Sequence, residues 1–267
     1  MIHLKESKEV ELIEDSYIYD DDTYFADRKY VTNSMLKVAS KHCPKEFFNY
    51  LDGETPTSEA FLIGSALHCM VLENQEFDNR YAITPSVDRR TKAGKEIFTE
   101  FSEKNEGKDI LTTSQYNKID AMYNSILGSE NSMNLLSGGE AEQIYCWKNV
   151  IHNTLCKGKI DYINKKDGYI VDVKTMQSVD IQSFTEFAEK YNVFQQAAFY
   201  LHGTGMKDFY FIAVSKNGPM SVAVYKLRQS SIDKGKVSFN IALSDYKKVI
   251  NAAPSEYEAN FGKIVEI

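Results

Sequence analysis

The sequence predicts an α/β fold in which a helical N-terminal part precedes a core of strands and helices. Helical patterns dominate the first half of the chain, and three β-rich runs then follow one another between residues 143 and 175. A helix-length segment, a hairpin pattern and a long final helix complete an order that favours helices packed on a central sheet. A length of 267 residues, with 43% hydrophobic and 26% charged residues, suits one large globular domain or two small ones.

The expected helices of the first half begin at residues that cap helices. Thr32 or Asn33 precedes the first, Pro44 opens the second and Ser58 precedes the third. The third helix, EAFLIGSALHCMVLEN, is apolar on most sides, which predicts that it lies in the core. Helices are expected at about residues 34–41, 44–53, 59–74, 95–106 and 114–127.

The remaining elements follow in chain order. A short strand and a basic loop are expected within residues 79–95, and a further loop at residues 131–139. A helix is expected from Ser183 to His202, where Gly203 stops it. Strands are expected at about residues 143–150, 154–163, 169–175, 209–215 and 221–227, the last two joined at Asn217-Gly218, and a final helix at 231–251. The expected organisation is an acidic N-terminal segment, residues 1–30, ahead of a single domain, residues 31–267.

Composition and charge argue against several classes of protein. The formal net charge of −7 disfavours a protein that coats nucleic acid over its whole surface, although a local basic groove is compatible with it. No apolar run is long enough to span a membrane, and the N-terminus lacks the apolar region of a secretory signal. The four cysteines match no zinc-binding spacing, so reduced thiols and a cytoplasmic location are expected.

Two acidic residues are expected to face each other across one hairpin. A polar turn that ends in Gly168 lies between two β-rich runs. Centring the hairpin on Lys166 and Asp167 sets Asp161 directly opposite Asp172, with Cβ atoms about 4.5–5.5 Å apart. Two carboxylates at that distance repel each other unless a cation lies between them. A hard divalent cation such as Mg²⁺ prefers oxygen ligands of this kind.

Lys174 adds a third charged group to the same strand face, because it lies two residues after Asp172. A metal held by two carboxylates beside an ammonium group suits phosphodiester hydrolysis, since the metal activates water and neutralises phosphate charge. The lysine can orient the nucleophile and stabilise charge in the transition state. An Asp-Val-Lys triplet alone is common on solvated strands. Here Ile170, Val171 and Val173 predict a buried strand, where charges without partners are costly.

Two helical motifs are expected to accompany this hairpin. Gly64 and His68 are four residues apart in GSALH and share one helix face, where glycine permits close backbone approach. Gln196 and Tyr200 share one face of QAAFY in the same way. For His68 and for Tyr200, a purely structural place in the core remains the alternative interpretation.

The motifs GSALH, GKID, VDVKT and QAAFY, in this order and spacing, resemble the RecB-like branch of the PD-(D/E)XK nuclease superfamily. Within that branch the chain is most similar to the RecE (exonuclease VIII) type of phage and prophage exonucleases. The segment VDRRTKAGK also resembles RecE-type sequences, and the likeness covers about residues 30–225. The fold that this resemblance implies is a PD-(D/E)XK core, a mixed central sheet flanked by helices, with an N-terminal helical part.

The activity that the resemblance implies is Mg²⁺-dependent digestion of linear double-stranded DNA from its ends, with Mn²⁺ as a substitute. The polarity would be 5′ to 3′, leaving 3′ single strands for phage-type recombination. Implied partners are double-stranded DNA ends and a single-strand annealing protein, in the cytoplasm of a phage host or bacterium. The implied assembly is a homo-oligomeric ring, a trimer or a tetramer.

The resemblance also assigns roles to residues of this chain. The implied metal ligands are His68, Asp161, Asp172 and the backbone carbonyl of Val173. Lys174 would be the catalytic lysine, and Gln196 and Tyr200 would support the site and contact the DNA backbone. Asp172 stands where the family often has glutamate, and no cysteine follows Cys156, so the iron–sulfur cluster of some RecB-like nucleases is not expected. Glu142 opens the strand that leads into the site and remains an open candidate.

DNA contacts are expected from a basic segment. Arg89, Arg90, Lys92 and Lys95 fall within seven residues and predict a phosphate clamp at the mouth of the site, with a solvated loop as the alternative. Ser65 lies three residues before His68 and is a candidate for contact with a terminal phosphate.

Several other functions stay open from the sequence. They are a RecB-like nuclease for single strands or particular DNA structures, a restriction-type endonuclease, a catalytically silent DNA-end-binding module, and a carboxylate-metal hydrolase on another fold. The sequence shows no target-recognition domain, which disfavours restriction.

Overall fold

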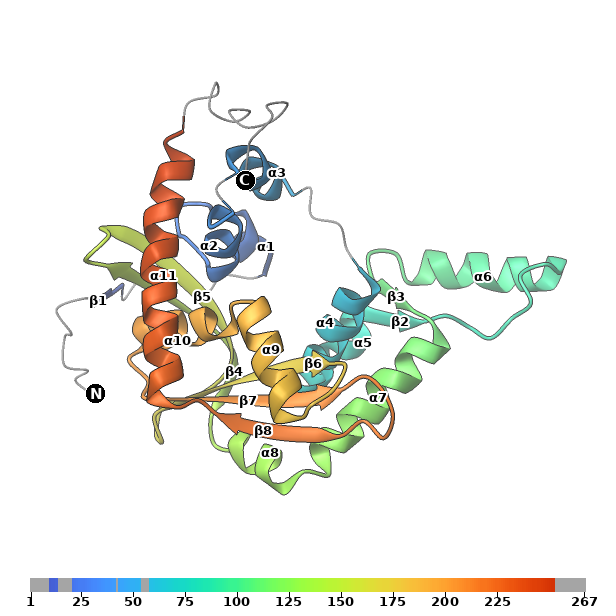
Figure 1. Ribbon diagram of the computed structural model, residues 1–267. Helices are drawn as coiled ribbons and strands as arrows, with labels where there is room; N and C mark the ends of the chain where they lie inside the picture. Colours follow the sequence, from blue (N-terminus) through green and yellow to red (C-terminus); the bar gives the residue numbers. More distant parts are fainter. Residues whose placement is uncertain (1–9, 14–20, 42, 54–57, 253–267) are drawn as a thin grey trace, which may run out of the picture.

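The computed structural model describes residues 10–13, 21–41, 43–53 and 58–252. A six-stranded mixed sheet lies at its centre, with helices on both sides (Figure 1). The strands, in spatial order, are β1 (Val10–Leu12), β4 (Glu140–Asn149), β5 (Thr154–Asn164), β6 (Tyr169–Met176), β7 (Asp208–Ser215) and β8 (Val222–Lys226). Neighbouring strands are antiparallel except for the pair β6–β7, which is parallel. The predicted mixed α/β architecture is therefore confirmed.

Two hydrophobic clusters cover the two faces of the sheet. On one face, Ile170 of β6 joins Trp147 and Phe199 under α10 (Val193–Thr204) and α11 (Gln229–Ile250). On the other face, Val171 and Val173 join residues of α4 (Glu59–Leu72) and α7 (Thr113–Leu127). Successive side chains of β6 thus alternate between the two faces, as a strand requires. Asp172 accordingly lies on the α10 side.

The helices of the first half form where the capping pattern predicts them. Side chains of Thr32, Ser58 and Thr112 each accept a hydrogen bond from the first turn of α2 (Asn33–Ala39), α4 and α7. The other elements of this half are α1 (Asp21–Ala26), α3 (Pro44–Leu51), the 3₁₀ turn Asn74–Glu76, α5 (Phe77–Arg80), β2 (Tyr81–Ile83), α6 (Lys92–Lys104), β3 (Asp109–Leu111) and α8 (Glu130–Leu135). Strands β2 and β3 pair in parallel as a separate small sheet.

Four sequence predictions are corrected. The expected loop at residues 131–139 contains α8, which Ser129 caps. The expected single helix at 183–202 is two helices, α9 (Ile181–Lys190) and α10, because Asn192 adopts a left-handed φ of 51° between them. Gly203 does not end α10; the helix continues to Thr204 and ends at Gly205, whose φ is 70°. Helix α6 begins at Lys92, three residues earlier than predicted.

The N-terminal part packs on the same domain. Strand β1 pairs with β4, and Val31 forms an isolated bridge to Cys156 of β5. Helix α1 begins at Asp21, and Asp20 before it lies outside the described residues. All four cysteines carry free thiols, and three of them are buried. Among the described residues, no helix combines the length and apolar character needed to cross a membrane.

Candidate active site

The hairpin β5–β6 has the register that the sequence predicts. Tyr162 pairs with Val171 and Asn164 with Tyr169, across a turn in which Gly168 adopts a φ of 80°. Beyond the Tyr162–Val171 pair the regular ladder ends, and the backbone N–H of Val173 instead donates to Oδ2 of Asp161 at 3.0 Å. The two strands diverge at the two acidic residues, so helices from both faces of the sheet can reach them.

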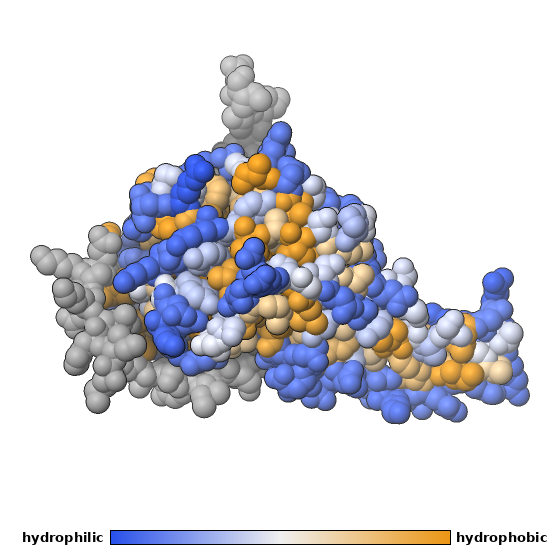
Figure 2. Space-filling view, turned by 90° about the horizontal axis from the view of Figure 1, so that it is seen from below, coloured by the Kyte–Doolittle hydropathy of each residue, from blue (hydrophilic) through white to orange (hydrophobic). Residues whose placement is uncertain are grey.

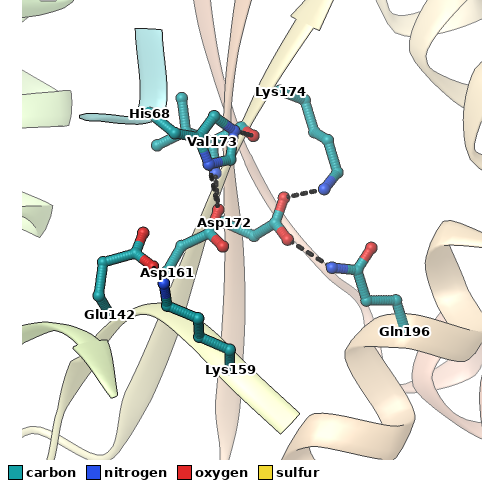
Figure 3. A network of polar contacts seen from close by, with 8 residues as sticks. All are labelled: His68, Glu142, Lys159, Asp161, Asp172, Val173, Lys174 and Gln196. Atoms are coloured by element: carbon teal, nitrogen blue, oxygen red, sulfur yellow. Dashed lines mark hydrogen bonds and ion pairs between the residues drawn. The ribbon is translucent and has the colours of Figure 1, made fainter. Parts of the chain in front are cut away.

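Helix α4 brings His68 to this opening (Figure 3). Its Nε2 lies 2.7 Å from the carbonyl oxygen of Val173, and its Nδ1 lies 3.4 Å from Oδ2 of Asp161. Burial, and next the ammonium of Lys174, lower the pKa of His68, so the ring is neutral near pH 7. A neutral ring that donates from Nε2 to the Val173 carbonyl presents the Nδ1 lone pair to Asp161. Only a proton or a metal ion between Nδ1 and the carboxylate satisfies both groups.

Glu142 completes a group of three candidate metal ligands with His68 and Asp161. One ligand atom of each lies within 4.8 Å of the other two. The β4–β5 ladder passes from the Ala141–Tyr162 pair to the Gln143–Ile160 pair, and Glu142 between them has a left-handed φ of 53°. Such a conformation costs free energy in a residue other than glycine, and strained residues of this kind cluster at functional sites. Glu142, left open by the sequence, is therefore a candidate ligand.

Asp172 lies beside this group but makes different contacts. Its side chain is 2% exposed, and its Oδ2 lies 2.6 Å from Nζ of Lys174. Its Oδ1 accepts a hydrogen bond of 2.7 Å from Nε2 of Gln196 on α10. Burial lowers the pKa of Lys174, but the negative charges of Asp172 and Asp161 raise it by more. The pKa of this lysine therefore lies above its ordinary value. The predicted grouping of Asp172, Lys174 and Gln196 is thus observed.

The acidic groups at the centre are crowded. Burial, and next the charge of Asp172, raise the pKa of Asp161 to about 7. Burial, and next Asp161, also raise the pKa of Glu142, although Nζ of Lys159 lies 2.9 Å from its Oε2. Figure 3 shows Glu142 and Lys159 on one side of the two aspartates, and Lys174 and Gln196 on the other. Carboxylates that resist ionisation in each other's presence gain most from a bound cation.

Tyr200 lies one turn after Gln196 and packs against the backbone of the GKID motif. A Cβ atom on Gly158 would lie 2.8 Å from its ring, so glycine is required at that position. Tyr200 also lines a cavity of about 470 Å³ beside the site, together with Arg28 and Lys159. Lys157, buried in the same wall, donates to the backbone carbonyl of Asp27 at 2.6 Å and to that of Tyr24. The wall thus holds both cationic side chains and the acidic residues Asp27 and Asp52, and Arg28 pairs with Asp52 at 3.4 Å.

The structure does not place the predicted basic segment at the catalytic group. The segment with Arg89 and Arg90 leads into α6, on an arm that projects from the domain (Figure 1). The guanidinium of Arg89 lies 3.7 Å from the ring centroid of Phe98, and Nε of Arg90 lies 3.4 Å from Oδ1 of Asp88. The position expected for them at the mouth of the site is therefore corrected. Ser65 is half-buried on α4.

Two lysines of the site were given no role by sequence reasoning. Lys159 lies two residues before Asp161 on the same strand, a spacing that could have identified it within GKID. Lys37 of α2 has no such signal, because α2 is distant in sequence from the hairpin. Burial, and next the charge of Lys174, lower the pKa of Lys37 to about 8.

Comparison with known proteins agrees with this fold. The family model described as "PDDEXK-like domain of unknown function (DUF3799)" matches residues 32–258. No protein with a curated description matches the sequence. A crystal structure of a "putative exonuclease" from Eubacterium rectale is similar, with a TM-score of 0.65 and 16% identity, over 93% of this chain and 96% of that one.

A second solved structure, a phage-related exonuclease from Haemophilus somnus, aligns over 70% of this chain and 93% of its own. Its TM-score of 0.34, at 14% identity, is too low to support an argument. The match of the family model over most of the chain, together with the Eubacterium structure, decides the classification. The chain belongs to this family of PDDEXK-like domains, and its fold is that of the PD-(D/E)XK nucleases.

Proposed function

We propose that the protein is a metal-dependent exodeoxyribonuclease that degrades linear double-stranded DNA from its ends, 5′ to 3′. The observation that carries this proposal is the grouping of His68, Glu142 and Asp161 directly beside the buried pair of Asp172 and Lys174. A candidate metal site next to a fixed ammonium group is an arrangement that suits phosphodiester hydrolysis. The name of the Eubacterium structure and the resemblance to RecE-type enzymes support an exonuclease.

The donor set fits a divalent cation such as Mg²⁺ or Mn²⁺. Carboxylate oxygens from Asp161, Asp172 and Glu142, the Nδ1 atom of His68 and the carbonyl of Val173 would hold it. When bound, such an ion neutralises phosphate charge and activates water. The carbonyl of Val173 contacts His68 here, so its role as a ligand requires the ring to shift.

The protein's own groups act on the scissile phosphate in distinct ways. The ammonium of Lys174 is fixed by Asp172 and can stabilise negative charge that develops on the phosphate. Gln196 fixes the other oxygen of Asp172, which holds that carboxylate in one orientation. Tyr200, one turn further along α10, lies against Gly158 at the cavity wall, where it can contact the backbone of a DNA strand.

Digestion assays test the proposal. Linear duplex should be degraded and closed circular duplex should not, and EDTA should stop the reaction. End labels on either strand distinguish 5′-to-3′ digestion from the opposite polarity. Cleavage of circular duplex would indicate an endonuclease. Binding of DNA ends without digestion would indicate a catalytically silent module.

Two variants separate catalysis from binding. Lys174→Ala should abolish cleavage and leave duplex affinity nearly intact, because one lysine supplies little of the total phosphate attraction. Asp172→Asn should lower activity by orders of magnitude. A matched control, Lys165→Ala, removes an exposed lysine paired with Glu140 at 2.7 Å and should change neither property. A proportional loss of binding and cleavage in Lys174→Ala would make this lysine a docking residue.

We further propose that Arg89, Arg90 and Lys92 contact the phosphates of duplex that extends beyond the site, and that Ser65 contacts a terminal phosphate. Neutralising the three cations should lower the salt dependence of binding by about 0.9 log units for each phosphate that is no longer neutralised. If the salt dependence of binding does not change, these three side chains are solvated charges that do not contact DNA. The expected product, a 3′ single strand, makes a single-strand annealing protein the proposed partner, in the cytoplasm of a bacterium or phage host.

A further inference from the structure

One ion pair of the site joins a lysine to a candidate metal ligand. Nζ of Lys159 lies 2.9 Å from Oε2 of Glu142, and the two side chains are only 20% and 17% exposed. Charged residues are usually solvated: hydrophilic residues occupy much of the surface in Figure 2, and the pair of Lys165 and Glu140 is about half exposed. The Lys159–Glu142 pair is instead withdrawn from solvent, where a charge without a partner is costly.

Glu142 has a second candidate partner besides Lys159. Its carboxylate belongs to the group with His68 and Asp161, in which one ligand atom of each residue lies within 4.8 Å of the other two. A divalent cation held by this group and the ammonium of Lys159 would be two positive charges on one carboxylate. Coulomb repulsion between them is strong at such short range. The ion and the lysine therefore compete for Glu142.

The side chain of Lys159 can leave Glu142 while its backbone stays in place. The residue pairs with Ile144 in the β4–β5 ladder, and its backbone N–H donates to the hydroxyl of Tyr24 at 3.1 Å. The ammonium, by contrast, lies at the end of a flexible four-carbon chain. Lys159 also lines the cavity of about 470 Å³ that Tyr200 lines. An ammonium that leaves Glu142 thus has this cavity within reach.

The charge of the site favours a phosphate as the next partner of this lysine. Figure 3 shows three carboxylates, those of Glu142, Asp161 and Asp172, together with the two ammonium groups of Lys159 and Lys174. When all are ionised, these groups carry an excess of one negative charge. A bound divalent cation converts this to an excess of one positive charge, because the ion's own charge dominates such a site. One phosphodiester group then restores neutrality.

We propose that Lys159 exchanges partners as the site is loaded: it neutralises Glu142 until a divalent cation binds, and its ammonium then contacts a phosphate of the DNA strand. This inference rests on the proposed function, because it needs both a metal ion and DNA at the site. Its consequence is that metal and DNA each strengthen the binding of the other, since thermodynamic coupling between two ligands is reciprocal.

Isothermal titration calorimetry with Mn²⁺, without DNA and at about pH 8 to limit competition from protons, tests the competition for Glu142. Lys159→Met should bind Mn²⁺ about tenfold more tightly than the wild type, because the competing ammonium is gone. Lys159→Arg keeps a cation beside Glu142 and should bind like the wild type. The matched control Lys165→Met breaks the exposed pair with Glu140, 2.7 Å apart, and should also bind like the wild type.

The salt dependence of duplex binding, measured by fluorescence anisotropy of a labelled duplex, tests the second partner. In Ca²⁺, the slope of log affinity against log salt should be smaller by about 0.9 in Lys159→Met than in the wild type, because one phosphate contact is lost. In EDTA the two slopes should be equal, since Glu142 holds the lysine. Glu142→Gln releases the ammonium without metal, so its slope in EDTA should exceed that of the wild type by about 0.9.

Weaker Mn²⁺ binding by Lys159→Met would overturn the proposal. The lysine would then orient Glu142 for the metal, and loss of such a partner costs about 10–100-fold in affinity. Unchanged Mn²⁺ affinity, or equal salt slopes in Ca²⁺, would overturn it as well. If circular dichroism shows that Lys159→Met does not fold, the slope of Glu142→Gln in EDTA decides.

Failure of this inference is distinguishable from failure of the proposed function. A wild-type protein that binds no Mn²⁺ would overturn both. A wild-type protein that binds Mn²⁺ and digests linear duplex, while Lys159→Met lacks the expected changes, would overturn the role of Lys159 alone.

Discussion

The buried pair of Asp172 and Lys174 should contribute strongly to stability, and its contribution can be measured in the metal-free protein. Nζ and Oδ2 are 2.6 Å apart, and the two side chains are 20% and 2% exposed. Replacing Lys174 by Met leaves a buried carboxylate that still accepts a hydrogen bond from the amide of Gln196. Breaking a buried pair in this way costs about 3–5 kcal/mol, and the retained amide bond places the expected loss near the lower end, about 3 kcal/mol.

Urea unfolding in EDTA, followed by circular dichroism, measures this loss. Asp172→Asn should also destabilise the protein, because it leaves the ammonium of Lys174 without its close counter-ion. The double variant removes both charges, so its loss should be smaller than the sum of the single losses by about 2 kcal/mol. Lys234→Met, which breaks an exposed pair with Glu189 at 2.7 Å, is the control and should unfold like the wild type. Additive losses within about 0.5 kcal/mol would refute a direct interaction.

Three further predictions concern the site and its supports. The pKa of Asp161 is raised to about 7, so between pH 4 and 7 the folded protein holds a proton that the unfolded chain has released. The free energy of unfolding in EDTA should therefore fall as the pH rises from about 4 to 7. Asp161→Asn should flatten this part of the pH profile of urea unfolding. A Cβ atom on Gly203 would lie 2.4 Å from the ring of Trp147, so Gly203→Ala should cost about 1–3 kcal/mol by the same assay, and an unchanged midpoint would show that the ring can move. Asn192 has a φ of 51°, so Asn192→Gly should match or exceed the wild type in thermal midpoint and Asn192→Val should fall below it; the reverse order would mean that the break between α9 and α10 is not set by this residue.

The sequence alone was sufficient for features that depend on neighbours along the chain. The polar turn before Tyr169 and the two-residue period of its flanking strands determine which residues pair, so the register beside Asp161 and Asp172 was predictable. The same period places Asp172 and Lys174 on one face. Caps at Thr32 and Ser58 predict helix starts for the equally local reason that a side-chain oxygen binds a backbone N–H of the first turn.

Only the tertiary structure decided which groups meet from distant segments. Glu142 joins His68 and Asp161 because its backbone turns into the left-handed region at the point where the β4–β5 ladder is interrupted. Its sequence context gives no sign of this, since β-strand patterns predict extended backbone. The approach of Lys37 is likewise set by the packing of α2 on α10 and α11, not by any spacing.

The arm shows the same division between local pattern and tertiary placement. The sequence predicts a helix at about residues 95–106, and an amphipathic helix forms at Lys92–Lys104. An amphipathic pattern does not specify what its apolar face contacts. Because β2 and β3 pair at the base of α6, the helix is held away from both hydrophobic clusters, and its side chains Ile97, Phe98 and Phe101 join neither of them. Local residue order determines an element, whereas the partner of that element depends on the packing of the rest of the chain.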